Sequence, residues 1–118
     1  MDIKDLEKFF ERITDEYGIP VEMRRKGKKL EVSVLADEFS REFLDYDNAV
    51  YDTIRVNKKI EMYFNRRGEI GLSVYNPSSG WEDRERLDID DIRIIGSELE
   101  KSKDKIKYTI LFARDDEE

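Results

Sequence analysis

Apolar residues recur at helical spacing most regularly near the start of the chain. Between residues 2 and 17 they fall at three- and four-residue steps, which predicts one amphipathic helix: Ile3, Leu6, Phe9, Phe10, Ile13 and Tyr17. Asp2 is a suitable N-cap, Gly18 stands where helices commonly end, and Pro20 prevents continuation. A helix with one apolar stripe has to cover another element, and a sheet is the expected partner.

From residue 19 to 36 the apolar residues alternate with polar ones, which predicts a β-hairpin. Gly27-Lys28 fits a two-residue turn with glycine first. This turn pairs Met23 with Val32 and Val21 with Val34, so every apolar side chain lies on one face. A slip of one residue would turn them to opposite faces, so the turn and the pattern support the same register.

A second hairpin is predicted from residue 59 to 75 by the same reasoning. A three-residue loop, Arg66-Arg67-Gly68, with Gly68 in a left-handed conformation, places the apolar residues of both strands on one face. The resulting pairs are Phe64 with Ile70, Met62 with Leu72 and Ile60 with Val74. On the other face Tyr63 lies opposite Gly71, where its ring can cover bare backbone.

The remaining segments are less regular. Phe39, Phe43, Tyr46 and Val50 favour a short helix over residues 37 to 52, although Asp47-Asn48 could instead form a turn. Ile54 and Val56 begin a strand whose parity continues into Ile60, with a bend between them. Residues 76 to 88 read as a long irregular loop, a type of segment that is often functional.

The end of the chain is read as two strands with a polar connection between them. Ile92 and Ile94 predict the first strand, and residues 97 to 104 read as the connection. The last strand follows the alternation of Ile106, Tyr108, Ile110 and Phe112. Residues 115 to 118 form an acidic tail that we expect to be disordered.

Together these elements predict an α+β fold with residues 1 to 118 in a single domain, since no linker composition divides the chain. A mostly antiparallel sheet of about five to six strands would be covered on one face by the N-terminal helix, with a second short helix. The helix and hairpin of the first 36 residues resemble those of the bacterial secretion chaperones in order. The closing helix of that family has no counterpart here, because residues 104 to 113 read as strand, so no residue roles are carried over.

Composition removes several classes of chemistry. The chain lacks cysteine and histidine, which excludes disulfides, cysteine or histidine catalysis and nearly every zinc site. We expect no cofactor. Neither a signal peptide nor an apolar run of the roughly 20 residues that span a membrane is found, so a cytoplasmic location without membrane insertion is expected. Charged residues make up 43% of the chain and glutamine is absent, which favours a thermophilic origin over a merely acidic mesophilic protein.

Two groups of carboxylates could bind a hard, oxygen-liganded cation. Asp45, Asp47 and Asp52 form the first group, without the glycine and closing glutamate of an EF-hand. The second group consists of Asp88, Asp90 and Asp91. A solvated surface for the first and capping for the second are the simpler interpretations. A metal-dependent enzyme built on these aspartates is therefore the third of our hypotheses.

Basic residues concentrate at the predicted turns and could contact the phosphates of a nucleic acid: Arg24, Arg25, Lys28, Arg66 and Arg67. The formal net charge of −7 argues against such a partner, but the clustering keeps it open. Basic turns also keep a small sheet soluble and its edges unreactive. A nucleic-acid-binding accessory protein is our second hypothesis.

Aromatic and arginine side chains suggest a protein interface, because these types are enriched at interface hot spots: Tyr63, Tyr75, Trp81, Arg84 and Arg86. Tyr63 and Tyr75 share the polar face of the second hairpin, and Trp81 lies in the predicted loop. For Trp81 taken alone, a plug that folds back on the core is the favoured interpretation, and an interface residue is the alternative. The favoured hypothesis is a non-enzymatic interaction or adaptor domain with a protein partner or as a homodimer.

Overall fold

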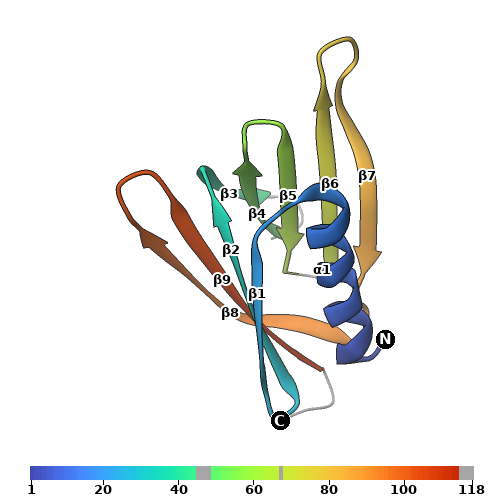
Figure 1. Cartoon of the computed structure of the whole chain (residues 1–118). Helices are drawn as coiled ribbons and strands as arrows, with labels where there is room; N and C mark the ends of the chain where they lie inside the picture. Colours follow the sequence, from blue (N-terminus) through green and yellow to red (C-terminus); the bar gives the residue numbers. More distant parts are fainter. Residues whose placement is uncertain (45–48, 67, 115–118) are drawn as a thin grey trace.

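The structure, a computed structural model, describes residues 1–44, 49–66 and 68–114. Within these ranges the chain forms one helix and nine strands (Figure 1). The elements are α1 (Ile3–Tyr17), β1 (Val21–Lys26), β2 (Lys29–Ala36), β3 (Glu38–Leu44), β4 (Ala49–Val56), β5 (Ile60–Asn65), β6 (Glu69–Asn76), β7 (Gly80–Asp88), β8 (Ile92–Lys101) and β9 (Ile106–Arg114). The predicted α+β class with an N-terminal helix is confirmed.

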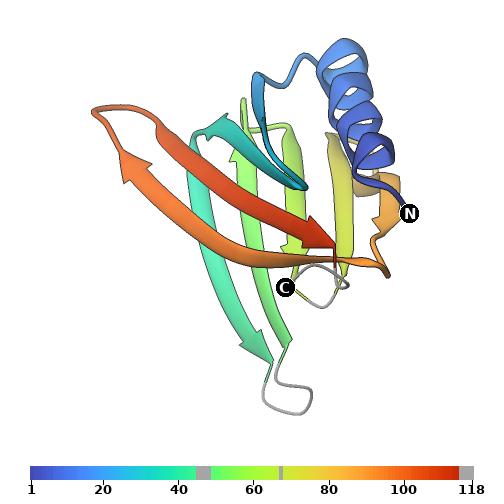
Figure 2. The same cartoon turned by 90° about the horizontal axis from the view of Figure 1, so that it is seen from below.

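The strands form two antiparallel sheets instead of one. The four-stranded sheet has the order β1-β2-β9-β8, and the five-stranded sheet runs as a meander from β3 to β7. Figures 1 and 2 show α1 beside β1, where it covers the β6 and β7 side of the five-stranded sheet. The predicted count of five to six strands in one sheet and the predicted second helix are therefore wrong.

The helix begins and ends where the sequence indicates. Asp2 precedes it, and the carboxylate of Asp5 accepts a hydrogen bond from the Asp2 N–H at 3.0 Å. Gly18 ends it with a φ of 68°, and its N–H donates to the Thr14 carbonyl. In the part of the chain that the structure describes, no helix is both long and apolar enough to cross a membrane.

Both predicted hairpins have the predicted register. Met23 lies opposite Val32 in β1 and β2, and Gly27 has a φ of 63° in the turn. In β5 and β6, Met62 lies opposite Leu72, and Gly68 has a positive φ of 114°. Apolar residues on these strands thus face inward, as the alternation requires.

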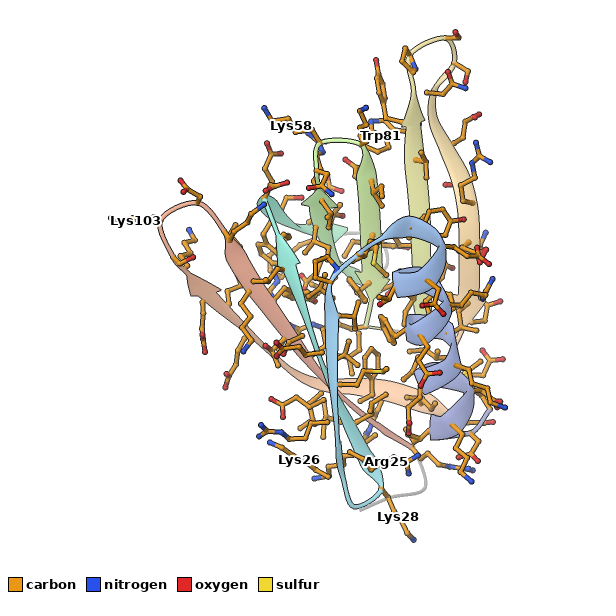
Figure 3. The ribbon with its side chains drawn as sticks, viewed as in Figure 1. Arg25, Lys26, Lys28, Lys58, Trp81 and Lys103 are labelled. Carbon is orange, nitrogen blue, oxygen red and sulfur yellow. The ribbon has the colours of Figure 1, made fainter. Side chains whose placement is uncertain are left out.

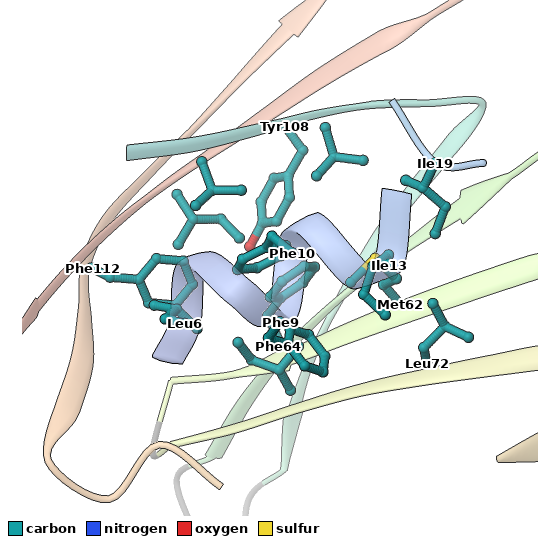
Figure 4. Close-up of a cluster of buried hydrophobic side chains, with 14 of the residues drawn as sticks. Leu6, Phe9, Phe10, Ile13, Ile19, Met62, Phe64, Leu72, Tyr108 and Phe112 are labelled. Carbon is teal, nitrogen blue, oxygen red and sulfur yellow. The ribbon is translucent and has the colours of Figure 1, made fainter. Parts of the chain in front are cut away.

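The core lies between the two sheets and under α1. It joins the apolar stripe of α1 to the inner faces of both sheets (Figure 4), and its largest fully buried side chains include Tyr108, Phe10, Phe64 and Phe112. The ring of Tyr108 lies 5.4 Å from those of Phe39 and Phe64, between centroids. Burial of these large apolar side chains is the main stabilising contribution expected for such a domain.

The segment predicted as a short helix contains strands instead. β3 starts at Glu38 and β4 ends at Val56, with Phe39 and Phe43 on the same side of β3. A spacing of four fits a strand as well as a helix, and Arg41, the residue midway between the two phenylalanines on the same side of β3, is charged. Arg41 points inward to a carboxylate on β4, so the inner face of β3 has no continuous apolar pattern. Tyr46 lies outside the described residues.

The predicted bend between β4 and β5 is a full reversal. Val56 lies opposite Ile60, and residues 57 to 59 form the turn between them. Asn57 and Lys58 adopt positive φ values of 55° and 63° without a glycine. Because the turn has an odd number of residues, the apolar side chains stay at every second position of the sequence on both sides of it. The sequence pattern therefore resembles one bent strand.

Residues 76 to 88 are also not a loop. Asn76 lies opposite Gly80 across a short turn, and β7 then pairs with β6 along its length. The register shifts between Leu72 and Ser73, which leaves Arg84 as the extra residue of a bulge. Likewise, the predicted polar connection after Ile94 is largely strand, because β8 continues to Lys101.

One residue forms the first of the two connections between the sheets; residues 89–91 form the second, between β7 and β8. Asp37 stands between β2 and β3, and its N–H donates to the Arg55 carbonyl at 2.8 Å. Its carboxylate accepts hydrogen bonds from the Asn57 N–H at 2.6 Å and from the Lys105 ammonium at 2.5 Å. These bonds, from Lys105 first, lower the pKa of Asp37. The corner is therefore fixed to the turn before β5 and to the turn before β9.

Candidate functional site

The face of the five-stranded sheet that points away from the core carries ordered rows of polar and aromatic side chains. We call this surface the outer face. Its four cross-strand rows follow from the register: Tyr75 and Trp81; Glu38, Arg55, Glu61, Ser73 and Asp83; Ser40, Thr53, Tyr63, Gly71 and Arg86; and Glu42, Tyr51, Asn65, Glu69 and Asp88. Cross-strand neighbours in such rows are in contact range of each other.

Trp81 and Tyr75 form the most exposed aromatic pair on this surface. They lie opposite each other on β7 and β6, with ring centroids 5.4 Å apart. The guanidinium of Arg55 lies 5.3 Å from the centre of the Trp81 ring, in a cation–π arrangement. Trp81 is 39% exposed and Tyr75 is 43% exposed. The idea that Trp81 folds back on the core is therefore wrong.

Tyr63 serves to cover the backbone of the same sheet. Its ring lies so close to Gly71 that a Cβ atom there would come within 2.1 Å of it. Its hydroxyl donates to Glu69 at 2.9 Å, and Arg86 donates to the same carboxylate at 2.8 Å. Burial first, and then the bond to Glu69, raises the pKa of Tyr63 to about 12. Of the predicted interface residues, Tyr63 is thus held against the sheet, whereas Arg86 is exposed and paired with Glu69.

The outer face is acidic and its charged groups are largely paired with each other. The four rows contain six acidic and two basic side chains, which gives them a net charge of −4. Arg55 binds Glu61 and Glu38, and Ser73 donates to Asp83 at 2.7 Å. The exposed aromatic pair therefore lies beside a fixed, negatively charged surface.

The structure brings together only part of the predicted interface. Tyr75 and Trp81 are in contact, whereas Arg84 lies in the β7 bulge and binds Glu82 at 3.4 Å. Sequence reasoning missed Arg55 and Tyr51. The available signal was their place on β4: Tyr51 precedes the inward-pointing Asp52, and Arg55 follows the inward-pointing Ile54. Because side chains alternate along a strand, both neighbours have to lie on the outer face.

A second polar cluster lies on the inner side of β3 and β4. Asp52 is only 1% exposed and accepts two hydrogen bonds from Arg41, at 2.6 and 3.0 Å. The buried Tyr108 hydroxyl donates to the same carboxylate at 2.7 Å, and Arg66 lies 3.9 Å from it. Burial acts to raise the pKa of Asp52, but the bonds from Arg41 and Tyr108 and the nearby guanidinium charges bring it below its ordinary value.

Neither predicted carboxylate group forms a metal site among the residues that the structure describes. Asp52 is engaged by Arg41 and Tyr108, while Asp45 and Asp47 lie outside the described residues. In the second group, Asp91 binds the N-terminal ammonium at 2.9 Å.

Basic residues at the turns, including Arg25 and Lys28 of the predicted phosphate-binding set, lie at separate corners of the molecule. Figure 3 places Arg25, Lys26 and Lys28 at one end, Lys58 at the opposite end and Lys103 at a third corner. Arg25 binds Glu7 of α1 at 2.8 Å.

The other members of the predicted set have different surroundings. Arg24 lines a surface cavity together with Lys107, and Arg66 belongs to the Asp52 cluster. Arg67 lies outside the described residues. The described basic turns therefore do not converge on one phosphate-binding surface.

Comparison of the chain with known protein families, curated proteins and solved structures finds no match. Its function therefore has to be argued from the surfaces described above.

Proposed function

We propose that this is a small cytoplasmic, non-enzymatic binding domain that recognises a partner protein through its outer face. The observation that supports the proposal is the exposed pair Trp81 and Tyr75 with Arg55 against the indole ring. Tryptophan, tyrosine and arginine dominate the energetics of protein interfaces. Here they are held by three strands of one sheet and contact one another, so little conformational freedom remains to be lost on binding.

The charge of the outer face indicates the chemistry of the partner. A net charge of −4 over the four rows favours a partner segment rich in lysine and arginine. The same charge disfavours a homodimer in which two outer faces meet, because like charges would be brought together. A basic side chain of the partner could also stack on Tyr75, as Arg55 does on Trp81.

The proposal can be tested by selecting peptides from a random displayed library on the immobilised protein. We expect enriched peptides to combine lysine or arginine with apolar residues. Because Trp81 is the only tryptophan, a tryptophan-free synthetic copy of each peptide should shift the protein's fluorescence as it binds. Trp81→Ala and Tyr75→Ala should each weaken binding by about tenfold or more.

Arg24→Gln is the matched control, since it changes an exposed side chain on the other sheet. It should leave peptide affinity unchanged. Circular dichroism should show that the variants stay folded. Selected peptides that bind Trp81→Ala as tightly as the unaltered protein, or that leave Trp81 fluorescence unchanged, would contradict the proposal.

A further inference from the structure

Two arginine side chains converge on one hydroxyl of β8. Arg41 reaches past Asp52, and its Nη2 donates to the Ser97 Oγ at 3.3 Å. Arg66, which follows β5, donates from its Nη2 to the same oxygen at 2.9 Å. Ser97 belongs to β8, the edge strand of the four-stranded sheet. Groups from three separate parts of the chain therefore meet at one point.

This cluster carries more positive than negative charge. Among the described residues, one carboxylate, that of Asp52, lies within ion-pair distance of both guanidinium groups, and it is buried. The side chains of Arg41 and Arg66 are 33% and 40% exposed, so solvent reaches them. The three groups together carry a net charge of +1. Asp52 holds the guanidinium groups of Arg41 and Arg66 close to each other. Because both groups are positively charged hydrogen-bond donors, they are suited to bind an anion.

An apolar surface adjoins the two arginines. Phe43 lies two residues after Arg41 on the same side of β3, and it is 69% exposed. Its cross-strand neighbour is Val50, whose carbonyl accepts a hydrogen bond from the Arg66 N–H at 3.3 Å. Figure 2 shows that these ends of β3 and β4 extend beyond β8. The Phe43 ring is thus uncovered next to the charged cluster.

We propose that Arg41, Arg66 and Ser97 bind the carboxylate of an organic acid whose aromatic or apolar body rests on Phe43. A monoanion neutralises the net charge of +1, whereas a phosphate dianion would leave one negative charge uncompensated. The planar guanidinium groups match the two oxygens of a carboxylate. The exposed ring of Phe43 offers an aromatic contact to the rest of the ligand. This site lies on the inner side of β3, so it is separate from the outer face and independent of its proposed function.

The test is a titration of the full-length protein at pH 7 with sodium benzoate, sodium acetate and sodium phosphate at constant ionic strength. Nuclear magnetic resonance of the arginine Nε–H groups and the Ser97 amide reports binding. We expect saturable shifts with benzoate, weaker binding of acetate, and phosphate binding no tighter than acetate.

Three variants separate the contributions. Arg66→Gln should weaken benzoate binding by about tenfold or more, because a charge-assisted hydrogen bond is lost while Arg41 still neutralises Asp52. Phe43→Ser should reduce benzoate binding to the level of acetate. Arg84→Gln, an exposed arginine on β7, is the matched control and should change nothing.

Several outcomes would overturn the proposal: no saturable shift with benzoate, equal affinity in Arg66→Gln, or tighter binding of phosphate than of benzoate. Backbone amide spectra establish that Arg66→Gln keeps its fold, so a loss of binding can be assigned to the site. Benzoate affinity should be retained in Trp81→Ala. This result would separate the site from the surface proposed for the partner protein.

Discussion

The two sides of the five-stranded sheet each contain an arginine–carboxylate pair with a similar shortest distance. On the inner side, Arg41 binds Asp52 at 2.6 Å, and on the outer face Arg55 binds Glu61 at 2.5 Å. The carboxylate side chain is 1% exposed in the first pair and 24% exposed in the second. Nearly equal distances therefore describe interactions in very different surroundings.

The difference shows that burial, more than distance, decides what such a pair does. Removing one member of a buried pair leaves an uncompensated charge in a medium that solvates it poorly. Removing one member of an exposed pair exchanges the interaction for hydration. The inner pair thus constrains the fold around Tyr108, whereas the outer pair orients Arg55 against Trp81.

The largest expected effect follows from Arg41→Met. It should lower the free energy of unfolding by about 3–5 kcal/mol, because Asp52 remains buried without its main partner. The double change Arg41→Met with Asp52→Asn should recover at least half of the loss, since no charge is left and Tyr108 keeps an acceptor. Urea denaturation measures both. A double variant as unstable as Arg41→Met would show that the charge is not the cause.

A smaller loss of unfolding free energy is expected when an added side-chain atom overpacks the outer face. Gly71→Ala places a Cβ atom 2.1 Å from the Tyr63 ring, which has to move, so we expect a loss of about 1–3 kcal/mol. Gly96→Ala is the matched control, because no atom lies within 4 Å of the Cβ position there. Thermal unfolding should leave the control nearly unchanged. Equal losses in the two variants would exclude the contact with Tyr63 as the reason.

The inner pair should also be visible in the pH dependence of stability. The pKa of Asp52 is lowered in the folded state, so its contribution is present above the unfolded pKa of about 3.9 and is lost as pH falls through the folded value. Asp52→Asn should therefore lose less stability than the unaltered protein as the pH is lowered from about 4 to 2. An equal loss of stability in Asp52→Asn and in the unaltered protein over this range would contradict the prediction.

The smallest effect is expected for Arg55→Gln. The pair with Glu61 is partly exposed, so unfolding free energy should change by only about 0.2–1 kcal/mol. Trp81 fluorescence should nevertheless change, because the guanidinium leaves the indole ring. A loss comparable with that of Arg41→Met would remove the distinction between the two pairs.

Sequence alone predicted those parts of the fold in which the inner face is uniformly apolar. The hairpins containing Met23 and Val32, and Met62 and Leu72, have the register that the alternation and their turns require. In these segments turn geometry, parity and burial agree, so one register satisfies all of them. The N-terminal helix was predictable for the same reason.

Prediction failed where charged side chains occupy inward positions. Arg41 and Asp52 interrupt the inner faces of β3 and β4, and Glu85 of β7 points inward to Arg12 of α1. The partner of each charged side chain lies on another element and cannot be recognised from the sequence. None of these three strands therefore shows the regular apolar–polar alternation of a half-buried strand. The Arg84 bulge shifts the parity of β7 further. The candidate carboxylate site was hidden for the same reason, because Arg41, Arg66 and Ser97 are distant in sequence.

The one-residue corner at Asp37 has a mechanical consequence for the proposed carboxylate site. The carboxylate of Asp37 joins the two sheets, because it accepts hydrogen bonds from Asn57 of the five-stranded sheet's β4–β5 turn and from Lys105, which precedes β9 of the four-stranded sheet. The contact between Arg41 and Ser97, 3.3 Å from Nη2 to Oγ, therefore depends on hydrogen bonds some distance from the ligand. Spin-label distances across the two sheets in Asp37→Ala would show whether loss of these bonds separates the sheets and so changes affinity without any change in the binding residues.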